Sequence, residues 1–162
     1  MTTTPLSASD RAALIARNIE AVDQHFHNEN PEGIDMAIAV YSDDIVWEVP
    51  ARGLVYRDAE QVKHEYQRIL GSMKVHKITN LHRFANEEWV FDDSIFEFTI
   101  TGDGFRNCPY PPGTTASVRL VHAFQCRDGK ICRENGYEIW RDINDKERVR
   151  DDIPPTATVQ VF

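Results

Sequence analysis

The dipeptide Asp128-Gly129 is the feature that most restricts the fold of this 162-residue chain. It stands between two long runs of β-branched and aromatic residues, 116–126 and 130–141. Asp-Gly is typical of a two-residue hairpin turn, because both loop positions must accept a positive φ. The two runs are therefore predicted to pair as antiparallel strands.

The length of this loop decides which side chains share a face of the hairpin. With two loop residues, His122 lies opposite Asn135 and Leu120 lies opposite Tyr137, on one largely apolar face that also holds Phe124. The other face carries two further opposed pairs, Arg119 with Glu138 and Ala123 with Glu134.

Helical patterns fill the first part of the chain. A first helix is predicted to begin at Ser7, where Ser7 and Asp10 form a capping-box variant. A second is predicted to begin with Asn30 as its N-cap and Pro31 at its first position. A third is predicted to begin at Asp58.

Strand patterns follow. Residues 45–49 form one early strand, and residues 75–84 and 89–101 alternate like the hairpin strands. The order predicts an α+β fold in which a curved antiparallel or mixed sheet wraps on three N-terminal helices as a cone-shaped barrel with an internal cavity. The whole chain, 1–162, is predicted to be one domain, with a core of about 9–141 and a tail of 142–162.

Charge and composition exclude several classes of partner. The chain has 18 Lys and Arg against 26 Asp and Glu, a net charge of −8, and no basic run, so nucleic acid and anionic membranes are not expected partners. No run approaches the ~20 apolar residues of a membrane span. The first ten residues lack a basic and apolar leader pattern, and the three cysteines are an odd number, which together predict a cytoplasmic protein.

Sequence motifs for cofactors and metals are missing. The chain has no G-x-S-x-G, P-loop or G-x-G-x-x-G string, and its six histidines show neither H-x-x-x-H nor H-E-x-x-H spacing. We therefore expect no cofactor and no metal site.

Polar residues on a predicted apolar face are the candidates for chemistry, because a buried polar group is costly without a partner. Alternation places His76 and Asn80 on one face with Ile78. Asp23 lies at the edge of the apolar stripe of the first helix. A carboxylate that orients an imidazole leaves its other nitrogen free as a base, so Asp23 and His76 are a candidate dyad, although both also fit ordinary structural roles.

A second group of candidates surrounds His122, which would act as a general acid or an oxyanion donor, or else be a satisfied core histidine. Tyr137 and Asn135 could bind a substrate oxygen, and Trp47 and Phe124 would pack in the core or form an apolar pocket wall. Two other histidines, His25 and His27, are predicted to lie at the surface of the first helix.

Several strings resemble the SnoaL-like families of the nuclear-transport-factor-2-like superfamily: AVYSDDIVWEVP, QCRDGKI and GYEIW. The resemblance covers residues 9–141 and implies that fold, together with a homodimer formed through the outer face of the sheet. Within the superfamily, EAVD and HKITN resemble the aspartate and H-x-x-x-N motifs of scytalone dehydratase and hexachlorocyclohexane dehydrochlorinase. This implies that Asp23 and His76 form a catalytic dyad. Asn80, like His122 and Tyr137, is a candidate to bind or protonate a substrate oxygen.

Ketosteroid isomerases are also similar to this chain, over LIARNIEAVD and YSDDIVWEVP. However, Asn18 stands near their helix tyrosine and Val49 where their base aspartate would be, so these two residues are expected to line the pocket without that chemistry.

These observations predict a small cofactor-independent lyase, a dehydratase or related proton-abstracting enzyme, acting on an apolar cyclic or aromatic molecule. The alternatives are a non-catalytic small-molecule-binding or assembly module and, with less support, an isomerase, polyketide cyclase or epoxide hydrolase. The last two would require carboxylates inside the pocket.

Overall fold

The computed structural model describes residues 6–144 and 155–157. Within them the chain forms three helices, a short 3-10 turn and six strands. The helices are α1 (Ala8–Asn28), α2 (Ile34–Ala39) and α3 (Ala59–Leu70), and the turn η1 spans Pro50–Arg52. The strands are β1 (Tyr41–Val49), β2 (Leu54–Tyr56), β3 (Met73–Ala85), β4 (Trp89–Ile100), β5 (Thr115–Arg127) and β6 (Lys130–Asp142).

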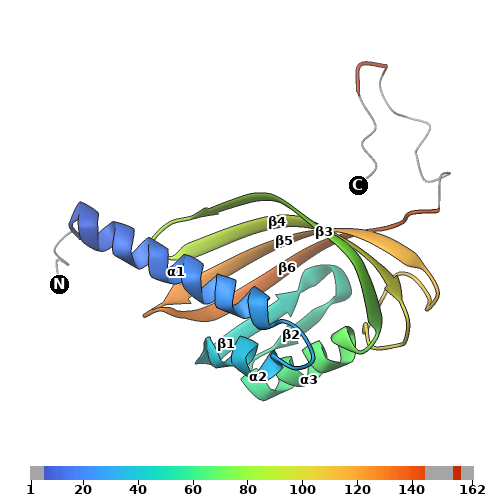
Figure 1. Ribbon diagram of the computed structural model, residues 1–162, viewed down its shortest axis with the longest axis horizontal. Coiled ribbons are helices and arrows are strands. Elements are labelled where there is room, and N and C mark those ends of the chain that lie inside the picture. Colours follow the sequence, from blue (N-terminus) through green and yellow to red (C-terminus); the bar gives the residue numbers. More distant parts are fainter. Residues whose placement is uncertain (1–5, 145–154, 158–162) are drawn as a thin grey trace.

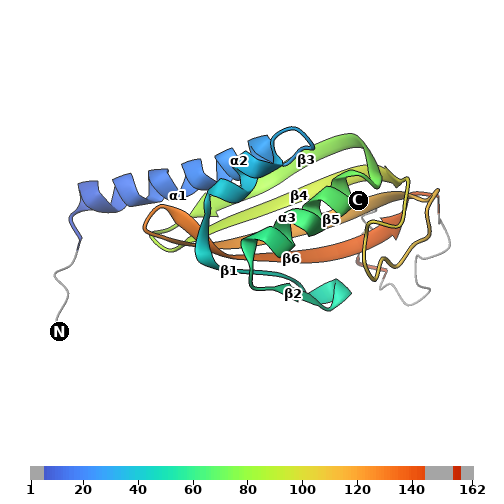
Figure 2. The ribbon, with the colours of Figure 1, turned by 90° about the horizontal axis from the view of Figure 1, so that it is seen from below.

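The strands form one mixed sheet in the order β2-β1-β6-β5-β4-β3. All neighbours are antiparallel except β1 and β6, which are parallel. The long strands curve around the side on which the helices lie (Figures 1 and 2). This confirms the predicted α+β class and the curved sheet on three helices. It corrects the predicted barrel, because β2 and β3 are two separate edges and the sheet does not close.

Helix capping explains two of the three helix starts. Ser7 accepts a hydrogen bond from the Asp10 amide and Asp58 accepts one from the Gln61 amide, as the capping patterns predict. The second helix begins later than predicted. Asn30 Oδ1 accepts from the Gly33 amide within a turn at 2.9 Å, and α2 starts only at Ile34. The Asn-Pro pair therefore forms a turn that precedes the helix.

The hairpin turn forms where expected, with φ of 53° at Asp128 and 78° at Gly129. Its register follows the prediction only for the pairs next to the turn, up to Cys126 with Ile131. Cys132 is then an extra residue, since Gln125 pairs with Arg133. This β-bulge moves all later pairs by one position, so His122 lies opposite Gly136 and not Asn135.

The bulge reverses the predicted assignment of β6 side chains to the two faces of the sheet. Glu134, Glu138 and Trp140 lie on the concave face with His122, whereas Tyr137 and Ile139 are 48% and 54% exposed on the convex face. This corrects the predicted pairs His122–Asn135, Leu120–Tyr137, Arg119–Glu138 and Ala123–Glu134. A one-residue shift reverses every side chain because the side-chain period of a strand is two.

Strand β3 contains two bulges of the same kind. Val75 pairs with Phe98 and Lys77 with Glu97, which leaves His76 as an extra residue. Leu81 is extra in the same way between Asn80 and His82. The predicted common face of His76, Ile78 and Asn80 is therefore wrong for His76.

Two apolar clusters pack between the sheet and the helices. The larger joins α1, α2 and α3 to strands that include β1, β5 and β6, with Val22, Ile45 and Phe124 fully buried. The smaller surrounds Phe98 and Ile100, and includes Phe105 from the 102–115 loop. A cavity lies between the two clusters, lined by Trp47 and Tyr66 of the first and by Phe98 and Phe105 of the second.

Two further predictions concern the membrane and the C-terminal tail. None of the described helices is both long and apolar enough to cross a bilayer. Most of the predicted tail, residues 145–154 and 158–162, lies outside the described residues.

Candidate active site

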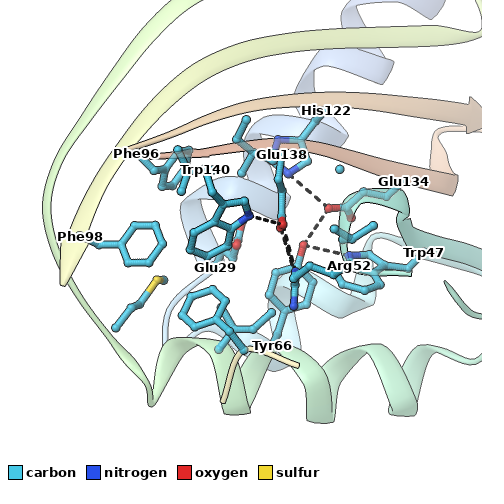
Figure 3. Close-up of a pocket in the computed structure, with 17 residues that line it drawn as sticks. Glu29, Trp47, Arg52, Tyr66, Phe96, Phe98, His122, Glu134, Glu138 and Trp140 are labelled. Carbon is cyan, nitrogen blue, oxygen red and sulfur yellow. Dashed lines mark hydrogen bonds and ion pairs between the residues drawn. The ribbon is translucent and has the colours of Figure 1, made fainter. Parts of the chain in front are cut away.

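An inner cavity opens between the concave face of the sheet and helices α1 and α3 (Figure 3). The enclosed cavity has a volume of about 70 Å³, and the space reaches about 580 Å³ when the open solvent at its mouth is included. Its apolar wall comes mainly from aromatic and aliphatic side chains of three strands and the 102–115 loop: Phe96, Phe98, Phe105, Val118, Leu120 and Trp140. The polar groups are Glu29, Arg52, Tyr66, His122, Glu134 and Glu138.

Glu134 is the centre of the polar end. Its side chain is 1% exposed, and it accepts hydrogen bonds from two phenols, Tyr66 at 2.7 Å and Tyr41. Two imidazoles face the same carboxyl: His25 Nε2 lies 3.5 Å from Oε2, and His122 Nε2 lies 3.7 Å from Oε1. Four elements, α1, β1, α3 and β5, thus bring side chains to one carboxylate on β6.

The two phenols are held in their protonated form. Burial, and then the charge of Glu134, raise the pKa of both Tyr41 and Tyr66 well above the usual value for tyrosine. They therefore donate to Glu134 at any physiological pH. His25, which is fully buried, contacts the backbone oxygen of Ala37 through Nδ1 at 3.2 Å. Because a carbonyl oxygen only accepts, Nδ1 carries a proton, and Nε2 faces the phenols and Glu134.

Glu29 is the carboxyl with the most altered acidity. It is the C-cap residue of α1, and its side chain is 20% exposed and faces the cavity. Burial, and second the charge of Glu134, raise the pKa of Glu29 to about 8. His25 Nε2 approaches its Oε2 to 3.9 Å, and no described residue forms a hydrogen bond with this carboxyl. A carboxyl of this kind exchanges its proton near neutral pH.

His122 is buried among aromatic rings. It stacks on Phe124 with a centroid distance of 5.3 Å and meets the edge of Phe26 at 5.2 Å. Burial lowers the pKa of His122 below its usual value, although the charge of Glu134 acts in the opposite direction. Its Nδ1 has no hydrogen-bond partner among the described residues. Because its pKa is lowered, the imidazole of His122 is neutral at pH 7. The neighbouring carboxylate of Glu134 can stabilise the protonated form when it arises.

The other polar wall of the cavity is an ion-pair network around Arg52. Arg52 donates to Glu138 through Nε at 3.0 Å and through Nη2 at 3.1 Å, and its Nη1 lies 3.7 Å from Glu65. Trp140 Nε1 donates to the same Glu138 at 2.7 Å. Arg106 from the 102–115 loop donates to Glu65 at 3.0 Å. These contacts fix Glu138 and fasten the loop to α3.

A second, more open chamber adjoins the inner cavity. It lies between the end of α1 and strands β3 and β4, with about 770 Å³ of space including its open side. Glu29, Met73 and Phe96 line both chambers. Asn80, a predicted substrate-binding residue, lines this outer chamber and not the inner one.

The structure does not bring Asp23 and His76 together. His76 Nε2 is 2.8 Å from the hydroxyl of Thr99, which alternates with the core residues Phe98 and Ile100 and so lies on the convex face. Asp23, on α1 over the concave face, forms an ion pair with Arg83. The sheet separates the two side chains, because the bulge at His76 reverses its direction.

The other predicted residues divide between cavity and packing. Trp47 and Val49 line the inner cavity, as does His122. Asn18 is fully buried and donates to the backbone of Asn86 and Glu87 in the β3–β4 turn. Phe124, Asn135 and Tyr137 lie outside the cavity lining. Phe124 packs in the core, and Asn135 Nδ2 donates to the Tyr137 hydroxyl at 3.5 Å on the convex side.

Sequence reasoning missed Glu29, Glu134, Glu138 and His25. His25 was predicted at the surface but is fully buried, whereas His27 is exposed. Its position is one turn after Ala21 and Val22, so the apolar stripe itself carried a signal for burial. For Glu134 and Glu138 the alternation pointed outward, and only the bulge corrects it. Within the described residues, no group of three or more His, Cys, Asp or Glu side chains is placed to hold a metal ion.

Solved structures with the same fold have distant sequences. A phenazine biosynthesis-related protein from Pseudomonas aeruginosa matches with a TM-score of 0.65 and 14% identity, over 82% of this chain and 86% of that one. An NTF2-like protein from Burkholderia xenovorans LB400 has a TM-score of 0.63 and 16% identity, over 77% and 91%. An LEH-like epoxide hydrolase from M. tuberculosis has a TM-score of 0.59 and 17% identity, over 77% and 84%.

At these identities the structural matches show the fold alone, the nuclear-transport-factor-2-like cone. No curated protein matches the sequence. The family is shown by the sequence itself, since residues 11–134, most of the chain, match one family throughout. The chain belongs to the SnoaL-like domain family.

Proposed function

We propose that this protein is a cofactor-independent acid–base enzyme, a lyase or isomerase, that acts on a small, largely apolar molecule in the inner cavity. The observation that carries the proposal is Glu29, a carboxyl with a pKa of about 8 that faces an aromatic cavity without a hydrogen-bond partner among the described residues. Perturbed acidity in a concave apolar pocket is characteristic of catalytic acids and bases.

Glu29 is the proposed base. A carboxylate whose conjugate acid has a pKa of about 8 is a far stronger base than an ordinary glutamate, and at pH 7 a useful fraction is ionised. It would remove a proton from a carbon of the substrate. In a lyase reaction, the electrons of the broken C–H bond then form a double bond as a leaving group departs. In an isomerase reaction, the proton returns to another atom of the substrate.

His122 and Glu134 are the proposed second proton-transfer pair. The neutral imidazole would exchange a proton with the departing or carbonyl oxygen, and Glu134, 3.7 Å away, would stabilise its charged form. A histidine–carboxylate pair was thus expected from the sequence, but with different members. His76 and Asp23 have no place in this mechanism, because they lie on opposite sides of the sheet.

Hydrolysis of an epoxide is a second candidate, supported by one observation. That chemistry needs carboxylates inside the pocket, and the bulge in β6 brings Glu134 and Glu138 there. Incubation with styrene oxide tests it: formation of phenylethanediol that is lost in Glu134→Gln supports hydrolysis, and unchanged epoxide excludes it for this substrate.

The test of the main proposal uses 5-nitrobenzisoxazole, a neutral aromatic probe of base catalysis. A base removes its carbon-bound proton, the C–H electrons form the nitrile, and the N–O bond breaks to release a coloured phenolate. We expect the rate to rise with pH through about 8, as Glu29 loses its proton. Glu29→Gln should lower the rate at least about 100-fold.

Glu60→Gln is the matched control, because Glu60 is an exposed carboxyl on α3 outside the cavity. It should leave the rate unchanged. A rate in Glu29→Gln equal to that of the unaltered protein, or no pH dependence near 8, would remove Glu29 as the base.

A further inference from the structure

We infer that the natural ligand of the inner cavity carries a cationic nitrogen, a protonated or quaternary amine, which lies against Glu29 and Glu134 between the aromatic walls. This inference rests on the proposed function in one respect, that the inner cavity is the substrate site. It adds the charge of the substrate.

The permanent charges on the Arg52 side of the cavity are already matched. Arg52 is the one Lys or Arg among the described lining residues. Both its Nε and its Nη2 bind Glu138, and Nη1 faces Glu65. Arg106 neutralises Glu65 from outside. An anionic ligand would therefore find no unmatched permanent cation on this side.

Among the described lining residues, the Glu29 side of the cavity has two carboxyls, Glu29 and Glu134, and no Lys or Arg. From the inner cavity the groups that face Glu29 are His25 on α1, Tyr41 on β1, Tyr66 on α3, His122 on β5 and Glu134 on β6. The phenols donate hydrogen bonds but supply no charge, and burial keeps His122 neutral.

The described lining of the outer chamber, which also includes the titratable His27, supplies no unmatched Lys or Arg either. Arg83 is the permanent cation among its described lining residues, and it is held by two carboxylates. It binds Asp23 and, through Nη2 at 2.8 Å, Asp92. At the junction of the chambers, the negative charge of Glu134 therefore disfavours ionisation of Glu29. The described lining residues offer no unmatched Lys or Arg there to offset it.

The end of helix α1 adds to this preference. Glu29 caps the C-terminus of a 21-residue helix, where the carbonyl oxygens of the last turn form the negative end of the helix dipole. This end stabilises cations. The position at the helix end is independent of the two side-chain carboxyls. Both features favour a positively charged ligand.

The walls of the cavity suit an organic cation. Trp47, Tyr66, Phe96, Phe98 and Trp140 present rings to the space beside the carboxyls (Figure 3). Aromatic faces attract ammonium groups, and this attraction grows when water is excluded. Inorganic cations lack the apolar surface that these rings would bury.

Binding and protonation are then linked. At pH 7 Glu29 mostly holds its proton, because its pKa is about 8. A cation beside the carboxyl stabilises the ionised form, so binding must release a proton, and by reciprocity the cation binds more tightly as pH rises. The bound substrate would thereby generate the base that the proposed reaction needs.

The test is isothermal titration calorimetry of the full chain with benzyltrimethylammonium at pH 7, in phosphate and in Tris. The difference in observed heat between the two buffers measures the protons released. We expect release approaching one proton per site, and binding at least about tenfold tighter than that of phenylacetate, an anion of similar size. Benzyl alcohol, which is neutral, should lie between them.

Variants decide whether Glu29 is responsible. Glu29→Gln should abolish the proton release and weaken benzyltrimethylammonium, while Glu60→Gln should change neither. Equal or tighter binding of phenylacetate, or cation binding without proton release, would overturn the inference. This result is separable from that of the proposed function. Proton-linked cation binding without turnover of 5-nitrobenzisoxazole refutes only the catalytic role. Turnover of 5-nitrobenzisoxazole without proton-linked cation binding refutes only the cationic ligand.

Discussion

Tyr66 donates a 2.7 Å hydrogen bond to Glu134, and the two residues come from α3 and β6, elements that are otherwise separated by the cavity. The bond closes the polar end of the site and holds the carboxylate in place. Because Glu134 is 1% exposed, each donor that it loses leaves a buried charge less well compensated.

Tyr66→Phe should therefore destabilise the fold by about 1–3 kcal/mol, since it removes a donor from a buried carboxylate without a large change in packing. Urea denaturation at pH 7 measures the effect. Tyr137→Phe is the control, because that ring is 48% exposed on the convex face. Equal stability of the two variants would show that Glu134 does not depend on the phenol.

Glu29 should make the stability depend on pH in an unusual direction. Below pH 4.5 its carboxyl is protonated in both states, and above about 8 it is ionised in both. Between these values the folded state keeps a proton that the unfolded chain has lost, so stability falls as pH rises, by at most about 1.4 kcal/mol per pH unit.

The comparison that isolates this effect is Glu29→Gln against the unaltered protein, by urea denaturation at several pH values from about 5 to 8. The variant should lose less stability over this interval, while Glu60→Gln should follow the unaltered protein. Parallel curves for all three would contradict the raised pKa of Glu29.

Arg52 and Glu138 should be strongly interdependent. Both side chains are buried, at 2% and 8% exposure, so Arg52→Met leaves Glu138 as an uncompensated charge and should cost about 3–5 kcal/mol. Arg52→Met combined with Glu138→Gln should recover a large part of this loss. A double-mutant cycle by urea denaturation provides the measurement, and simple additivity of the two changes would refute the coupling.

The register of β6 can be checked by chemical labelling. In a chain whose three cysteines are replaced by serine, single cysteines at positions 137 and 139 should react rapidly with a maleimide, and those at 138 and 140 slowly. The reverse pattern would restore the unbulged register. Slower labelling of 137 and 139 at higher protein concentration would support the homodimer expected through this face.

The course of the chain was largely predictable, and the reason lies in local signals. Ser7 and Asp58 mark helix starts through their own hydrogen bonds, and Asp128-Gly129 marks the turn through its backbone angles. Each signal is complete within a few residues. The apolar stripes then determine which helix faces meet the sheet.

The site was less predictable, because it depends on which way strand residues point. A bulge has no reliable sequence signature, and His76 and Cys132 look like ordinary members of alternating strands. The extra residue in β6 turned Glu138 inward, and the one in β3 turned His76 outward, which changed the candidate chemistry. The pKa of Glu29 is raised first by burial and second by the charge of Glu134, more than a hundred residues away in the sequence, and only the tertiary structure supplies either cause.

The bulge at Cys132 also gives the chain a tolerance to changes in length. Gln125 already pairs with Arg133 across the extra residue, so deletion of Cys132 would shorten β6 while every later pair, including His122 with Gly136, keeps its partner. The cavity would retain Glu134, Glu138 and Trp140, and only the local bend of the strand would be lost. Loss of a single residue at this position would therefore change the curvature of the strand and leave the side chains of the site in place.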